Sequence, residues 1–164
     1  MKEIITAGLL FVATPVEVIT ADKPTYGSSE HIQCLAMNMY HEARDQGSAG
    51  LLAVSSVVLN RVKDKRFPND ICEVIEQGPT RESWKTRQTP DPTDAVFYPI
   101  RHRCQFSWFC DGKSDNPKHE KSYNRMLDFS ELLLSGSVDF LDITDGAQFY
   151  HADYVRPAWA KTKK

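Results

Sequence analysis

The stretch from Cys34 to Asp45 contains the residues best placed to do chemistry. Apolar residues recur there at helical spacing, so the stretch predicts a helix with one buried face and Ser29 as its N-cap. At roughly 100° per residue, Glu42 lies on the flank of that face rather than opposite it. A carboxyl group at such an edge can be partly desolvated and can hold a proton near neutral pH, as a general acid must. A glutamate in a helix is more often a solvated surface group, so the periodicity alone goes no further than a candidate acid.

Length and charge bound the classes of protein to consider. The 164 residues are enough for one domain with a substantial core. The net charge of −2 gives no general attraction to nucleic acid, so we expect no nucleic-acid partner. We also expect no cofactor, and a protein that acts as a monomer.

Residues 1–23 resemble a secretory leader. A lysine precedes the apolar run from Ile4 to Ile19, and Ala21 stands before a polar stretch, as at a signal-peptide cleavage site. Proline and glutamate interrupt the run, so we do not expect a stable membrane span. We therefore assign residues 24–164 to a single domain and expect a secreted, periplasmic or wall-bound protein.

The chain has four cysteines, Cys34, Cys72, Cys104 and Cys110. An even number fits disulfides in an oxidising compartment, and four cysteines allow three pairings. Cys104 and Cys110 are close in sequence and flank an aromatic loop, so we favour that bridge, which leaves Cys34 to pair with Cys72. A zinc site is the alternative, but the chain has no Cys-x-x-Cys pair and the ligands would be scattered.

The periodicity elsewhere predicts further helices. The segment from Ala49 to Val62 is apolar over most of its circumference, so it should be the central buried helix. A short helix is expected from Ile71 to Gln77, capped by Asn69 or Asp70. Another should open at Asn116-Pro117, with proline in the first helical position, and end at a glycine.

Three segments lack a helical period. Thr80 to Arg103 is polar and rich in proline, and we interpret it as a long ordered loop. Polar and aromatic residues alternate from Cys104 to Gly112, which favours a strand that runs into a tight turn. Asp145-Gly146 predicts a second, hairpin-like turn before Gln148 to Tyr154.

Four blocks of this sequence together resemble the bacterial and phage cell wall hydrolases related to the spore-cortex-lytic enzymes. The combination is specific, although each block alone would be weak, and the likeness extends over almost the whole chain after the leader. The blocks are Cys34 to Arg44, Ala53 to Val62, Cys104 to Trp108 and Gly146 to Ala152.

This resemblance implies a fold, an activity and a site. The expected fold is α+β and mainly helical, similar to lysozymes and lytic transglycosylases, with a small β-hairpin region. The expected activity is cleavage of the glycan strand of peptidoglycan, of the muramidase or lytic transglycosylase type, with Glu42 as the catalytic acid. The aromatic loop and the Tyr150-His151 segment are expected near the cleft. Because the family has phage members, a phage-encoded lysis protein is among the expectations.

Several side chains are candidates for contact with the glycan. Gln105, Ser107 and Tyr150 can form hydrogen bonds to sugar hydroxyl or N-acetyl groups, and Trp108 offers a flat apolar face to a pyranose ring. Phe106 is either a similar contact or plain core. Two further candidates are Asn38, one turn before the candidate acid, and His151.

No second carboxylate stands out in the sequence. Asp45 is near Glu42, but its helix angle points it toward solvent. Glycosidases assisted by a group of the substrate itself do not need a second carboxylate. We therefore expect Glu42 to donate a proton first and to act as a base afterwards.

Two other readings remain open. A zinc protease would need His-Glu-x-x-His, and the position four residues after His41 is Asp45, so we expect no metal. A non-catalytic glycan-binding or structural protein with the same fold is the alternative from a different class. Activity on purified cell walls separates these readings.

Overall fold

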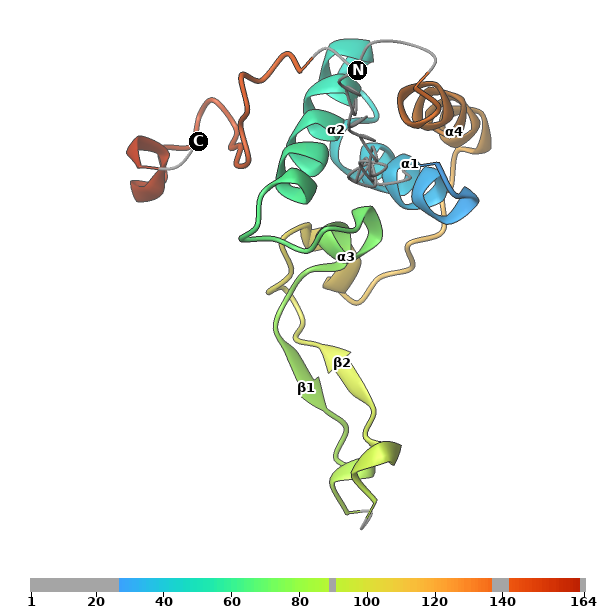
Figure 1. The fold of residues 1–164 in the computed structure, drawn as a ribbon, viewed down its shortest axis with the longest axis vertical. Coiled ribbons are helices and arrows are strands. Elements are labelled where there is room, and N and C mark those ends of the chain that lie inside the picture. The colour runs from blue at the N-terminus through green and yellow to red at the C-terminus, as the bar shows by residue number, and fades with distance from the viewer. Residues whose placement is uncertain (1–26, 89–90, 137–141, 163–164) are drawn as a thin grey trace, which may run out of the picture.

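The structure is a computed structural model that describes residues 27–88, 91–136 and 142–162. The predicted leader and its cleavage site lie outside the described residues. Within these residues four α-helices form the body, and a two-stranded antiparallel hairpin projects from it (Figure 1). The helices are α1 Ser29–Ala43, α2 Gly47–Lys63, α3 Ile71–Glu76 and α4 Glu120–Leu134, and the strands are β1 Thr80–Glu82 and β2 Phe97–Pro99. Short 3₁₀ turns occur at Thr86–Gln88, Pro92–Asp94, Ser107–Cys110 and Ala158–Lys161.

Helix α1 is the central element, because α2, α3 and α4 all pack against it. The cap is Ser28, one residue earlier than predicted, and its hydroxyl accepts a hydrogen bond from the His31 backbone N–H. The predicted apolar face is buried, with Leu35 and Met39 fully enclosed. We expected α2 to be the central helix, and this was wrong. Part of the apolar surface of α2 borders a cleft instead of another helix.

The structure contains two disulfides, and both match the predicted pairs. The Cys34–Cys72 bridge joins α1 to α3, which Asp70 caps by accepting a hydrogen bond from the Glu73 backbone N–H. The Cys104–Cys110 bridge closes the loop at the base of the hairpin. Gly78 lies against this bridge, since a Cβ there would come within 3.0 Å of Cys104.

Helix α4 begins at Glu120 and not at Pro117 as predicted. The hydroxyl of Tyr40 accepts hydrogen bonds from the backbone N–H groups of Lys118 and His119, at 3.0 and 3.1 Å. These bonds keep Lys118 and His119 outside the helix, so α4 starts directly after them. Its end is as expected, because Gly136 follows with φ of 70°, a conformation that favours glycine.

The structure differs from the sequence prediction in three other segments. Thr80 to Arg103 is not a loop but the β1–β2 hairpin with its 3₁₀ turns. Cys104 to Gly112 is not a strand, because a short disulfide loop tightens it into a 3₁₀ turn. Asp145 and Gly146 do form a turn, with φ of 53° and 77°, but no strand flanks it in the described chain. The fold class is confirmed: the domain is α+β and mainly helical, with one small sheet.

Candidate active site

Glu42 lies in the last turn of α1, between the buried interior and an open cleft. Its neighbour Ala43 is buried, whereas Glu42 itself is half-buried. The Tyr150 hydroxyl donates a hydrogen bond of 2.7 Å to Glu42 Oε2. Among the described residues Oε1 has no hydrogen-bond partner, so this oxygen is available to a bound molecule.

Tyr150 belongs to the stretch from Asp142 to Tyr154, which we call the Tyr150 segment. Tyr150 reaches Glu42 because this segment is attached to α2. The Asn60 amide donates hydrogen bonds to Asp142 Oδ2 at 2.8 Å and to the Ala147 carbonyl at 3.2 Å. Burial alone would raise the pKa of Asp142, but hydrogen bonds from Thr144, Asn60 and the Gly146 backbone hold that pKa well below its usual range. Asp142 therefore stays ionised and organises the turn that leads to Tyr150.

Arg61 attaches the next part of the segment from inside the protein. This residue is 4% exposed, and its Nε donates a hydrogen bond of 2.8 Å to the Gln148 carbonyl. Its guanidinium lies 5.2 to 5.5 Å from the ring centroids of Phe106, Phe67 and Phe149. Burial lowers the pKa of Arg61, and the three aromatic faces offset part of the lost hydration.

A polar bridge completes the attachment. The Gln148 side chain donates to Asp64 Oδ2 at 2.7 Å and accepts from Arg66 Nη2 at 2.6 Å. Hydrogen bonds from Arg66 and Gln148 hold the pKa of Asp64 well below its usual range. The carboxylate therefore remains an acceptor at mildly acidic pH.

The cleft between α2 and this segment has a volume of about 1030 Å³. On α2 the lining includes three small residues, Ala49, Gly50 and Ala53, beside Val54 and Val57. Carboxylates come from Glu42 and Asp153. Further lining residues are Ala43, Gln46, Ile143, Thr144, Ala147, Phe149, Tyr150, His151, Ala152 and Tyr154.

Tyr150 remains a hydrogen-bond donor over the whole useful pH range. Partial burial of the phenol raises its pKa most, and the neighbouring Glu42 carboxylate raises it further. The residue is still 44% exposed, and it lines the cleft. One residue can thus hold the Glu42 carboxyl group and contact a ligand.

The aromatic loop packs against His41 and Asn38 of α1. Trp108 stacks on His41 with ring centroids 4.5 Å apart, and its indole N–H donates a hydrogen bond of 3.0 Å to Asn38 Oδ1. Asn38 is 0% exposed and Phe106 is 1% exposed, so both are core residues in this structure. Gln105 and Ser107 are exposed. None of the residues of this loop is among those that line the Glu42 cleft.

Asp153 and Tyr154 were missed by the sequence reasoning. They directly follow the Gly146 to Ala152 block, and that proximity was the only available signal. Asp45 is 80% exposed and paired with Arg44, and it does not line the cleft. Asp153 is therefore the second carboxylate to consider.

His41 and His151 each have a ring nitrogen within hydrogen-bond distance of a backbone carbonyl. His41 Nε2 lies 3.0 Å from the Asp115 carbonyl, and His151 Nδ1 lies 2.8 Å from the Ala152 carbonyl. Within the described part of the chain, no three histidine, cysteine or acidic side chains form a group that could hold a metal ion.

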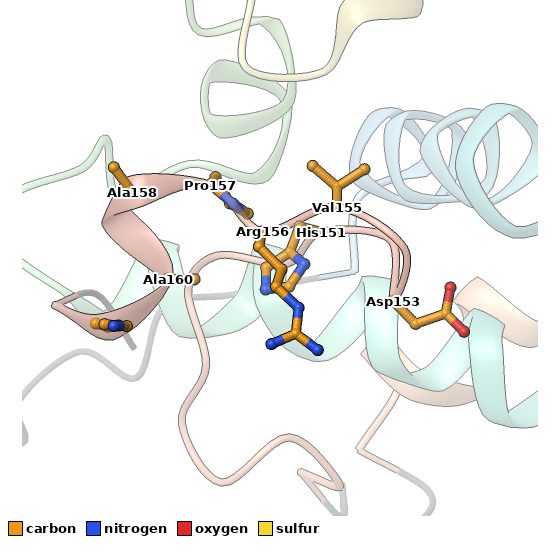
Figure 2. Close-up of a pocket in the computed structure, with 8 residues that line it drawn as sticks. His151, Asp153, Val155, Arg156, Pro157, Ala158 and Ala160 are labelled. Carbon is orange, nitrogen blue, oxygen red and sulfur yellow. The ribbon is translucent and has the colours of Figure 1, made fainter.

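A second hollow, of about 810 Å³, is formed within the C-terminal segment (Figure 2). It shares only His151 and Asp153 with the Glu42 cleft. Arg156 adds a positive charge at this hollow.

The helices in the described ranges are too short or too polar to cross a bilayer.

Comparison with known proteins identifies the family. Residues 45–164, well over half of the chain, match the cell wall hydrolase family, and the match begins three residues after Glu42. The spore cortex-lytic enzyme of Bacillus subtilis (strain 168) is 36% identical over 59 residues, which make up 36% of this chain and 19% of that protein. The chain thus matches about a fifth of the length of that relative. No solved structure matches it. On the extent of the family match, the chain belongs to the cell wall hydrolase family.

Proposed function

We propose that this domain cleaves the glycan strand of peptidoglycan with Glu42 as its general acid. The observation that carries the proposal is the hydrogen bond from Tyr150 to Glu42 Oε2, beside an open cleft and with Oε1 unoccupied among the described residues. The family is one of wall hydrolases, which narrows the substrate to the wall polymer.

The reaction needs one proton donor at the scissile bond. Glu42 gives its proton to the glycosidic oxygen, the C1–O bond breaks, and the leaving oxygen keeps the bonding electron pair. The sugar that is left has positive charge developing at C1. Its own 6-hydroxyl then attacks C1 and returns a proton to Glu42. This step closes a 1,6-anhydro ring and consumes no water.

Intramolecular attack is favoured because the 6-hydroxyl is already held next to C1. The rings of Phe149, Tyr150 and Tyr154 border the cleft and can cover the sugar against water. Asp153 supports a second candidate, in which this carboxylate activates water and the product is a reducing end. Both candidates use Glu42 as the acid.

The products distinguish the two candidates. We expect mass spectrometry of digested peptidoglycan to find 1,6-anhydro ends, lighter than reducing ends by one water, and we expect Asp153→Asn to keep at least about half of the wild-type rate. General-base catalysis by Asp153 would instead cost the variant roughly 10²–10⁴-fold. Reducing ends together with such a loss would establish the hydrolytic mechanism.

We propose that Tyr150 is a positioning residue for Glu42. Tyr150→Phe removes the hydroxyl that holds Oε2, and misplacement of a catalytic group lowers the rate. We expect kcat to fall roughly ten- to a hundredfold, with KM and the melting temperature nearly unchanged.

Tyr123→Phe on α4 is the matched control, since it removes a phenolic hydroxyl from a residue that does not line the cleft. It should keep wild-type kcat. If Tyr150→Phe raises KM and leaves kcat intact, the hydroxyl contacts the glycan instead of positioning Glu42.

The wider setting is also part of the proposal. We propose that residues 24–164 form the catalytic domain, that residues 1–23 direct export, and that the protein acts as a monomer at the wall. The two disulfides support an oxidising compartment. A non-catalytic wall-binding protein would leave purified walls uncut.

A further inference from the structure

The β1–β2 hairpin exposes aromatic side chains that the helical body does not cover. Figure 1 shows the hairpin projecting away from the helices, beyond α3. Trp84, Tyr98 and Phe97 are 62%, 59% and 58% exposed. Large apolar side chains grouped on such a surface mark binding sites more often than isolated ones do.

The hairpin is held by its own backbone and not by these aromatic rings. The Ser83 N–H donates to the Val96 carbonyl at 2.7 Å, and the Ile100 N–H donates to the Pro79 carbonyl at 2.9 Å. The Gln105 N–H donates to the Gln77 carbonyl at 2.8 Å, beside the Cys104–Cys110 bridge. The pairing of the two strands and the base of the hairpin are thus accounted for by backbone hydrogen bonds.

The two exposed aromatic rings of strand β2, Phe97 and Tyr98, lie on opposite faces of the hairpin. Arg81 pairs with Tyr98 and Glu82 pairs with Phe97, so Tyr98 and Phe97 point to opposite faces. Tyr98 and Trp84 line a hollow of about 480 Å³, whereas Phe97 does not. The full lining is Arg81, Glu82, Ser83, Trp84, Lys85, Arg87, Tyr98 and Pro99.

The hollow carries an excess of positive charge. Arg81, Lys85 and Arg87 face a single carboxylate, Glu82. None of the three cations forms an ion pair with another residue of the described chain. Lys85 Nζ lies 5.9 Å from the centroid of the Trp84 ring, so charge and flat apolar surface occur side by side. Such a site suits a ligand that combines sugar rings with negative charge.

We propose that this hollow is an accessory binding site for the anionic glycan of the wall, an uncut stretch of peptidoglycan. The pyranose rings lie against Trp84 and Tyr98, and the carboxylates of the attached peptides contact Arg81, Lys85 and Arg87. The hollow shares no residue with the Glu42 cleft, so the site holds the polymer elsewhere along its length. This proposal rests on the proposed wall substrate, and its test measures binding separately from cleavage.

The test is co-sedimentation of the full chain with purified insoluble peptidoglycan, stripped of phosphate polymers. Glu42→Gln serves as the background so that the polymer stays intact. We expect Trp84→Ala with Tyr98→Ala to weaken binding about tenfold or more, as loss of aromatic anchors does. Phe97→Ala is the matched control on the opposite face and should bind as the background does.

A second pair of variants tests the charge. Arg81→Gln with Arg87→Gln should weaken binding and reduce its dependence on salt, whereas Lys121→Gln on α4 should change neither. A neutral polymer of the same sugar rings should bind more weakly than peptidoglycan. Binding that persists unchanged in the aromatic or the arginine pair overturns the proposal.

Two other outcomes also decide against it. If Phe97→Ala weakens binding as much as the aromatic pair does, the hairpin binds through non-specific apolar contact and not through this hollow. If stripping the phosphate polymers abolishes binding, the ligand is a phosphate polymer. In a protein that keeps Glu42, the hairpin substitutions should leave the cleavage of short soluble glycan fragments unchanged. The cleavage assay therefore tests the proposed reaction, and the binding assay tests the hairpin site.

Discussion

Glu42→Gln should reduce cleavage of purified peptidoglycan by roughly 10²–10⁴-fold, because it removes the only acid that we place at the scissile bond. The amide has the size of the carboxyl group and can still accept the hydrogen bond from Tyr150. The fold should therefore persist, with a nearly unchanged melting temperature. The measurement is release of soluble glycan fragments, with a thermal melt of the same sample.

Glu30→Gln is the matched control for this prediction. Glu30 is exposed on the first turn of the same helix, about 18 Å along the axis from Glu42. It should keep wild-type activity. A Glu42→Gln protein that retains more than about a tenth of the activity would remove Glu42 from the mechanism.

The second large effect concerns stability. A disulfide limits the freedom of the unfolded chain, and the effect grows with the length of the loop that it closes. Cys34 and Cys72 are 38 positions apart, whereas Cys104 and Cys110 are 6 apart. Replacing the first pair with alanine should lower the free energy of unfolding by about 4 kcal/mol, and replacing the second pair by about 2 kcal/mol.

Denaturant unfolding of the two double-alanine variants measures this difference, with the oxidised wild type as reference. Each variant should contain two free thiols only after reduction, because the remaining pair stays bridged. Equal losses for the two variants would contradict the loop-length argument. Free thiols in the oxidised wild type would contradict the pairing itself.

Most of the helices could be predicted because their signals are local. The period of apolar residues set the buried face of α1, and Asp70 marked the start of α3 by its ability to cap. The closeness of Cys104 and Cys110 in sequence favoured that bridge and left Cys34 to pair with Cys72, and the structure contains both pairs. The family likeness led to the α+β class.

The remaining features depend on contacts between distant residues. Pro117 could not open α4, because Tyr40, far away in sequence, holds the two following backbone N–H groups. The hairpin from Thr80 to Pro99 is defined by backbone pairing, which leaves little trace in a polar sequence. Tyr150 is held near Glu42 by contacts that its segment makes with Asn60 and Arg61 on α2, residues far from it in sequence.

The way in which the Tyr150 segment is attached makes the stability of the cleft distinct from the stability of the helical core. The backbone hydrogen bonds of this segment are local, from Ala147 to Thr144 and from Val155 to Ala152. Its connection to α2 is made by side chains, chiefly those of Asn60 and Arg61. The free energy that keeps the cleft assembled is therefore distinct from the free energy that keeps the disulfide-bridged helices packed. A helical spectrum or a melting curve reports on the second quantity, so an intact core does not guarantee an intact Glu42 cleft.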